Sequence, residues 1–270
     1  MEPHTPPQPL APVDYDQVQH QVYARGRALP ATAVQQYMAV FGAHLPARRP
    51  LAGVDLGSGT GRFTPALAEA FGGPVFGVEP ADGMRRTAEA EATHPQVTYL
   101  AGRAEAIPLA DGVADFVLMF LSYHHVVDKP AAAREIARVL KPGGRLLLRS
   151  TFQERIPDHW WRGYFPRSWD VERAMFPTVA ETQALFAAAG FHTQAVVQME
   201  LPFEGDLADA VARLKLRAVS TFEHMTEAEL DEGFARLDAD LARGAVVEKS
   251  TLGDFIVFAS PAALQESAIA

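Results

Sequence analysis

Short apolar runs alternate with amphipathic stretches between residues 51 and 150, and this alternation limits the possible folds more than any other feature of the sequence. The apolar runs have the length of buried strands, and the stretches between them carry apolar residues at helical spacing. Repeated strand–helix–strand units with short connections predict a parallel, doubly wound α/β sheet covered by helices. The strands are expected at 51–56, 74–79, 97–102, 114–121 and 143–150, and the helices at 64–72, 83–92 and 129–140.

The segments on either side of this alternation have a different character. Proline-rich residues 1–13 predict a flexible tail, and residues 14–41 have helical spacing with a break at Pro30. Residues 152–178 are rich in Trp, Phe, Pro and Arg and show no clean period. Beyond them we expect a helix at 179–190, a strand at 191–203, two amphipathic helices within 206–243 and a last strand at 250–260. A late strand pair of this kind can add an antiparallel edge to a parallel sheet.

Composition excludes several classes of site. The chain has 270 residues, no cysteine and a formal net charge of −9, so disulfides, thiolate metal sites and cysteine nucleophiles are ruled out. The charge disfavours nucleic acid, because binding to phosphates needs cations. There is neither a secretory signal nor an apolar run of about 18 residues, so we expect a cytoplasmic protein without membrane contact. No HExxH pattern or His/Asp cluster predicts a required metal.

The sharpest local motif is a glycine loop between the first strand and the first helix. It reads VDLGSGTGR, with Gly57, Gly59 and Gly61 at alternate positions. A dinucleotide-binding turn has its third glycine one position later, where this chain has Arg62. Asp55 before the glycines repels a pyrophosphate but suits a ligand that carries an ammonium group. The alternative is a tight strand–helix turn that holds no ligand.

One residue at the end of the second strand and one beyond it extend this motif. Glu79 ends the strand where, in a doubly wound fold, a carboxylate can accept hydrogen bonds from both ribose hydroxyls. Met84 then lies where an apolar side chain can cover one face of an adenine ring. A solvated charge at Glu79 and plain core packing at Met84 are the alternatives.

Together these motifs resemble the class I S-adenosylmethionine-dependent methyltransferases, in particular the small-molecule methyltransferases. The successive motifs that carry the resemblance are VDLGSGTGRF, GVEPADGM, GRAEAIPLADGVADFV and REIARVLKPGGRLLL. The resemblance implies S-adenosylmethionine as cofactor and a Rossmann-like, seven-stranded sheet in the order 3-2-1-4-5-7-6 with the last strand antiparallel. It also implies a helical lid at 14–45 ahead of a methyltransferase domain at 46–270, with a substrate cap at 152–178 and 205–245.

The resemblance further implies roles for individual residues. Asp55 and the loop from Gly57 to Gly61 are expected to hold the methionine part of the cofactor, and Glu79 its ribose. Ala104 and Glu105 fall at the adenine edge. Arg103 stands where many members of the family have Asp, which removes a side-chain acceptor for the adenine amino group and shifts the expected contact to the backbone of Ala104.

The acceptor is expected beyond the carboxyl ends of the strands, where ligands of open α/β sheets bind. There Leu121 would face the amino-acid end of the cofactor. His124 is predicted as a catalytic base, with packing as the alternative, while His125 is expected to pack against the next helix. The tryptophans within 152–178 are expected to supply part of a substrate wall.

The N-terminal segment is predicted to close over the cofactor. It contains YARGR, in which Tyr23 is a candidate catalytic residue facing the sulfonium and Arg27 a candidate partner of the cofactor carboxylate. The alternative is a permanent helix with solvated arginines.

The sequence therefore predicts methyl transfer to a small-molecule acceptor, in secondary metabolism as one setting. One alternative is another reaction of the same cofactor, in which its own amino group attacks the methionine chain and methylthioadenosine is released. Another alternative is a module that binds the cofactor without turnover. The sequence leaves the acceptor atom and the oligomeric state open.

Overall fold

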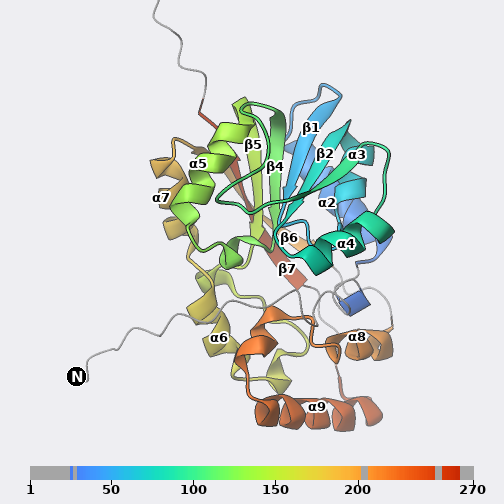
Figure 1. Cartoon of the computed structure of the whole chain (residues 1–270). Helices are drawn as coiled ribbons and strands as arrows, with labels where there is room; N and C mark the ends of the chain where they lie inside the picture. Colours follow the sequence, from blue (N-terminus) through green and yellow to red (C-terminus); the bar gives the residue numbers. More distant parts are fainter. Residues whose placement is uncertain (1–24, 27–28, 202–205, 247–250, 262–270) are drawn as a thin grey trace, which may run out of the picture.

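The computed structural model describes residues 25–26, 29–201, 206–246 and 251–261, and it is built around one seven-stranded sheet (Figure 1). The strand order is β3-β2-β1-β4-β5-β7-β6, with β7 antiparallel to both of its neighbours and the other pairs parallel. This order and the antiparallel last strand confirm the predicted fold. The strands are β1 (Leu51–Leu56), β2 (Gly72–Glu79), β3 (Val97–Ala101), β4 (Ala114–Phe120), β5 (Leu140–Ser150), β6 (His192–Leu201) and β7 (Thr251–Ala259).

Helices cover both faces of the sheet. On one face α2 (Ala31–Ala43) and α3 (Thr64–Phe71) pack Tyr37, Phe41 and other apolar side chains against β1, β4 and β7. On the other face α5 (Lys129–Val139) and α7 (Val179–Ala188) bury residues such as Ile136 and Phe186. Every residue of β4 is buried, as expected of a central strand, and α4 (Asp82–Glu91) contacts β2 and β3.

Two strands begin earlier than the sequence predicts. Strand β2 starts at Gly72, where the chain leaves α3 in a left-handed conformation (φ 70°) and pairs at once with Leu51. Strand β5 starts at Leu140, which pairs with Ala114 before a register shift in the ladder. Gly72, which the sequence placed at the end of the preceding helix, is thus the first residue of β2.

A separate group of helices lies beyond one end of the sheet, as Figure 1 shows for α6, α8 and α9. We call this group, residues 152–178 and 206–246, the helical subdomain. Phe165, Phe222 and Leu237 are buried in its own apolar core. The two helices predicted within 206–243 are confirmed as α8 and α9. Its elements are η3 (Gln153–Arg155), η4 (Arg162–Tyr164), α6 (Ser168–Met175), α8 (Leu207–Leu214), η5 (Ser220–His224) and α9 (Glu227–Ala242).

The aperiodic stretch 152–178 is organised around a buried arginine. Arg162 is fully buried, and its Nη2 donates to Glu172 Oε2 at 2.9 Å. Its Nε donates to the Pro157 carbonyl at 3.0 Å, and its guanidinium lies over the Trp169 ring at 4.4 Å. A charged group at the centre of this segment explains why the short helix α6 has no apolar period that the sequence could show.

The predicted tail at 1–13 and residues 14–24 and 27–28 of the predicted lid lie outside the described residues, whereas Arg25, Gly26 and residues 29–45 of the lid belong to the described part. Within the described ranges, no helix is both long and apolar enough to cross a bilayer. The same ranges contain no group of three or more His, Asp or Glu side chains that could hold a metal ion.

Candidate functional site

The glycine loop connects β1 to α3 at the carboxyl edge of the sheet. Its three glycines all adopt positive φ angles, 74° at Gly57, 57° at Gly59 and 77° at Gly61, a region that favours glycine. The Gly57 N–H donates to the Val78 carbonyl at 2.8 Å, and the Ser122 hydroxyl donates to the Leu56 carbonyl at 2.8 Å. These bonds tie the loop to β2 on one side and to the end of β4 on the other.

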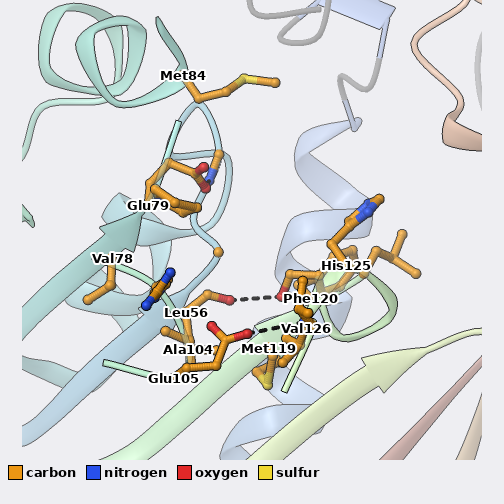
Figure 2. Close-up of a pocket in the computed structure, with 17 residues that line it drawn as sticks. Leu56, Val78, Glu79, Met84, Ala104, Glu105, Met119, Phe120, His125 and Val126 are labelled. Atoms are coloured by element: carbon orange, nitrogen blue, oxygen red, sulfur yellow. Dashed lines mark hydrogen bonds between the residues drawn. The ribbon is translucent and has the colours of Figure 1, made fainter. Parts of the chain in front are cut away.

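A cavity of about 390 Å³ opens beside this loop, and we call it the first cavity. Figure 2 shows Glu79 and Met84 on one side of it and His125 on the other. Seven of the residues predicted to bind the cofactor line this cavity: Gly57, Gly59, Glu79, Met84, Ala104, Glu105 and Leu121. Two others, Asp55 and Gly61, do not belong to its lining.

Glu79 is the acidic side chain at the end of β2. Its carboxylate accepts hydrogen bonds from the backbone N–H groups of Gly59 at 2.8 Å and Ala81 at 2.9 Å, so it holds the glycine loop and the start of α4 together. The side chain is largely buried but lines the first cavity. Each carboxylate oxygen has a second lone pair, which can accept a bond from a ligand hydroxyl.

Asp55 lies beneath the loop. Its Oδ2 accepts a hydrogen bond from the Thr64 hydroxyl at 2.7 Å, and the side chain is 3% exposed. Burial raises the pKa of Asp55 to about 6, although the Thr64 hydrogen bond and the nearby Arg62 oppose the shift. The group is thus an ionisable carboxyl close to the loop, in contact with α3.

The end of the first cavity away from the glycine loop is formed by α4 and by the connection between β3 and β4. Met84 is buried and lines the cavity with an apolar surface. Glu105 Oε1 accepts hydrogen bonds from the N–H groups of Val127 and Asp128, both at 3.1 Å, which closes the rim. Arg103 also lines the cavity. It is exposed, and its backbone forms an isolated antiparallel bridge with Ala106.

Leu121 follows β4 with a φ of 55°, a left-handed conformation that is costly for a leucine. Its N–H donates to the Arg149 carbonyl at 2.8 Å, which holds the strained backbone against β5. Strain of this kind concentrates at functional sites. The sharp turn at Leu121 places the residues after β4 across the end of the sheet.

A second cavity of about 250 Å³ lies between the sheet edge and the helical subdomain. It shares three lining residues with the first cavity: Phe120, Leu121 and His125. The two cavities therefore meet at the end of β4. Further lining residues come from distant segments, and they include Tyr37, Arg62, Arg149, Pro157, His159, Trp161, Glu172, Phe176 and 218–221.

Both histidines after β4 belong to this junction. His124 lines the second cavity, with its ring centroid 3.9 Å from that of His125 and 4.9 Å from that of Phe176. His125 lines both cavities, whereas the sequence assigned it to packing against the next helix. Burial lowers the pKa of His125 to about 4, with His224 and Lys129 adding to the shift, so its imidazole is neutral at pH 7.

Sequence reasoning missed most of the second cavity. Arg149, His159 and Thr221 come from β5, the segment after η3 and η5, and no short motif links them. Of the three tryptophans, only Trp161 lines the cavity. The positions of Tyr23 and Arg27 lie outside the described residues, although the neighbouring Gly26 and Leu29 belong to the lining.

The residues of the first cavity fit S-adenosylmethionine. The Glu79 carboxylate, already fixed by two backbone donors, presents acceptor capacity for a ribose diol. Met84, Val78 and Met119 provide the apolar surface that an adenine ring needs. Gly57 and Gly59 have no side chain, so a ligand in this cavity can approach the backbone closely.

Comparison with known proteins agrees with this geometry. A family model described as a methyltransferase domain matches residues 54–148. An uncharacterised methyltransferase of Mycobacterium tuberculosis is 41% identical over 136 residues, which span 50% of this chain and 51% of that protein. The chain thus matches about half the length of this relative. A demethylmenaquinone methyltransferase of Bacillus licheniformis is 30% identical over 177 residues, spanning 57% of this chain and 75% of that protein.

Solved structures share the fold. The crystal structure of a putative methyltransferase from an antibiotic biosynthesis pathway of Anabaena variabilis superposes with a TM-score of 0.70 and 23% identity. The superposition covers 83% of this chain and 96% of that one. At this identity the likeness concerns the fold.

Proposed function

Because this chain belongs to the class I S-adenosylmethionine-dependent methyltransferase family, we propose that it transfers a methyl group to a small-molecule acceptor held in the second cavity. The observation that carries the proposal is the junction of the two cavities at Phe120, Leu121 and His125. Two reactants held on either side of such a junction are aligned for direct transfer. A cytoplasmic location and a role in secondary metabolism are part of this proposal.

In the first cavity, Glu79 is proposed to hold the ribose, Met84 one face of the adenine, and Ala104 and Glu105 its edge. The loop from Gly57 to Gly61, with Asp55 beneath it, is proposed to hold the methionine part. When bound, the cofactor supplies a methyl carbon for an acceptor nucleophile, while the electron pair of the broken sulfur–carbon bond returns to sulfur and S-adenosylhomocysteine is left.

The residues at the junction align the acceptor and exclude water. Phe120 and Leu121 present apolar atoms to both cavities, and a dry site strengthens the electrostatic contacts within it. His125 is neutral and lies at the junction. We assign the role of base to His124, which lines the acceptor side, for acceptors that carry a proton on the nucleophilic atom. Tyr23 and Arg27 remain candidates for closing the cofactor end.

The second cavity argues against the cyclisation of the cofactor's own methionine chain. That reaction needs no room for another molecule, whereas about 250 Å³ adjoins the first cavity. Identification of the nucleoside product separates the two reactions. The protein is incubated with S-adenosylmethionine alone and with a panel of acceptors, including a naphthoquinol suggested by the demethylmenaquinone methyltransferase relative. S-adenosylhomocysteine formed only with an acceptor supports methyl transfer; methylthioadenosine above the non-enzymatic background contradicts it.

Glu79→Ala tests the first cavity. The loss of charge-assisted hydrogen bonds is expected to weaken binding of S-adenosylhomocysteine by roughly tenfold or more, since such bonds contribute about 1.5–3 kcal/mol. Glu91→Ala is the matched control, because Glu91 is an exposed carboxylate at the end of α4 outside both linings. Calorimetry on both folded variants gives the comparison, and equal affinities would remove Glu79 from the cofactor site.

A further inference from the structure

Arg149, at the end of β5, is a buried cation on the wall of the second cavity. Its side chain is 5% exposed. Its hydrogen bonds come from Nη1, which donates to the carbonyls of Ser150 at 2.6 Å and Asp254 at 3.3 Å. Its Nε is buried and has no hydrogen-bond partner in the part of the chain that the structure describes. The guanidinium is therefore anchored through Nη1, while its Nη2 makes no hydrogen bond with the described residues.

The surrounding residues fix the guanidinium in this position. Its Cζ lies 5.9 Å from the centre of the Phe120 ring, which belongs to both cavities. Gly253 of β7 leaves the space on another side, because a β-carbon there would lie 2.5 Å from Nη2 and 2.9 Å from Nε. A side chain held in this way has lost most of its conformational freedom before any ligand binds, which lowers the entropic cost of binding.

Among the described residues that line the second cavity, arginines outnumber carboxylates. Arg62 is a second cation in the lining, with its Cζ 5.1 Å from the centre of the same Phe120 ring. The lining contains one carboxylate, Glu172, which is ion-paired to the buried Arg162 at 2.9 Å and accepts a hydrogen bond from the Thr221 hydroxyl at 2.9 Å. A chain with a net charge of −9 has thus placed two arginines on this wall.

We propose that Arg149 binds a carboxylate group of the acceptor through Nη2 and its positive charge, so that the acceptor is a small carboxylic acid with an aromatic or apolar body. A hydrogen bond from a guanidinium to a carboxylate is charge-assisted, and such bonds are among the strong ones. The rings of Tyr37, Trp161 and Phe176 line the same cavity and suit an apolar body. The inference rests on the proposed function, in which the second cavity holds the acceptor.

The test uses three probes of similar size and different charge, of which the carboxylate and the amide also share one shape. The full chain is saturated with S-adenosylhomocysteine and titrated with phenylacetate, phenylacetamide and phenethylamine by calorimetry. We expect saturable binding of the carboxylate, and at least tenfold weaker binding of the neutral amide and the amine. A preference for the amide or the amine, or no binding of the carboxylate, would overturn the inference.

Variants then assign the preference to Arg149. Arg149→Met is expected to reduce phenylacetate affinity at least tenfold, while Arg149→Lys retains part of it because a charge remains without the planar guanidinium. Arg145→Met is the matched control, since Arg145 lies on the same strand outside the second cavity. Unchanged phenylacetate binding by Arg149→Met would contradict the proposal.

A second variant keeps the charge and moves it. Gly253→Ala would push the guanidinium from its seat and is expected to weaken phenylacetate binding, which makes the test independent of whether Arg149→Met folds. S-adenosylhomocysteine affinity is measured for every variant. If the wild-type protein does not bind S-adenosylhomocysteine, the proposed function is contradicted. If it binds S-adenosylhomocysteine but shows no preference for the carboxylate probe, this inference alone is contradicted.

Discussion

The carboxyl group of Asp55 is buried beneath the glycine loop, and its pKa is raised to about 6. Its ordinary value is 3.8, so the folded protein binds a proton more tightly there than the unfolded chain does. The free energy of unfolding therefore falls as the pH rises from about 4 to about 6, and this loss is fully present above pH 6.

Asp55→Asn removes the buried charge while keeping an oxygen that can accept the Thr64 hydrogen bond. We expect the variant to be more stable than the wild type at pH 7 by up to about 3 kcal/mol, since one pKa unit corresponds to about 1.4 kcal/mol. The advantage should shrink as the pH falls toward 4. Thermal unfolding at several pH values measures it, with the exposed Glu91→Gln as control. A stability gain that grows on acidification would contradict the assignment.

At this scale, short motifs predicted the first cavity better than the second. Glu79, Gly57 and Gly59 follow strand ends within one motif region, so their meeting at the carboxyl edge follows from the parallel sheet. Arg149 and Thr221 meet only through the placement of the helical subdomain, which no local pattern specifies. The position of His125 just after a strand end was a signal for the site. Its apolar neighbours instead led to the prediction that it packs against the next helix.

The turn from β1 into α3 depends on glycine for two separate reasons. Gly57 has a φ of 74°, and a β-carbon there would lie 2.5 Å from the Ser122 β-carbon. Gly72, at the end of α3, has a similar φ of 70° but has nothing within 4 Å of the same position. Alanine at Gly72 would therefore cause backbone strain alone, whereas alanine at Gly57 would cause both strain and crowding.

Gly57→Ala is expected to weaken S-adenosylhomocysteine binding at least tenfold, because Ser122 and the loop must both move. Gly72→Ala carries the same kind of backbone strain, about 1–2 kcal/mol, and should lower the melting temperature without changing that affinity. Calorimetry and thermal unfolding on the pair give both quantities. Equal losses of affinity would show that the loop responds to strain alone.

The elements of the sheet followed from the sequence pattern because the central strands are short apolar runs and the flanking helices carry apolar residues at helical spacing. The helix α6 was missed for a physical reason: Arg162 and Glu172 occupy the centre of that segment, and their ion pair takes the place of an apolar stripe. The same pair joins η4 to α6, so the segment's structure depends on tertiary contacts.

On the scale of the whole molecule, the N-terminal segment meets the helical subdomain at the second cavity. Gly26 and Leu29 line that cavity, and a β-carbon on Gly26 would lie 2.6 Å from that of Ala218. This segment can act as a lid only if it also detaches from the second cavity and from the helical subdomain when no ligand is bound.

We therefore expect trypsin to cut near Arg25 quickly in the free protein and several-fold more slowly with S-adenosylhomocysteine present. Removal of residues 1–30 should spare the cooperative unfolding transition but abolish turnover, because water would reach the junction of the cavities. Cleavage at Arg134, an exposed residue of α5 outside both cavity linings, serves as the internal reference for general protection. Equal cleavage near Arg25 with and without ligand, or a fully active truncated protein, would show a permanent structural helix instead.

The position of β7 between β5 and β6 has a consequence for the order in which the molecule is completed. During synthesis β6 leaves the ribosome well before the only strand it pairs with, because residues 202–250 separate it from β7. By then all described residues that line the first cavity, which fall between positions 56 and 127, have already left the ribosome. The Asp254 carbonyl that anchors Arg149 arrives last, with β7 itself. A nascent chain can thus assemble the half that holds the cofactor early, while the half that selects the acceptor is finished by the final strand.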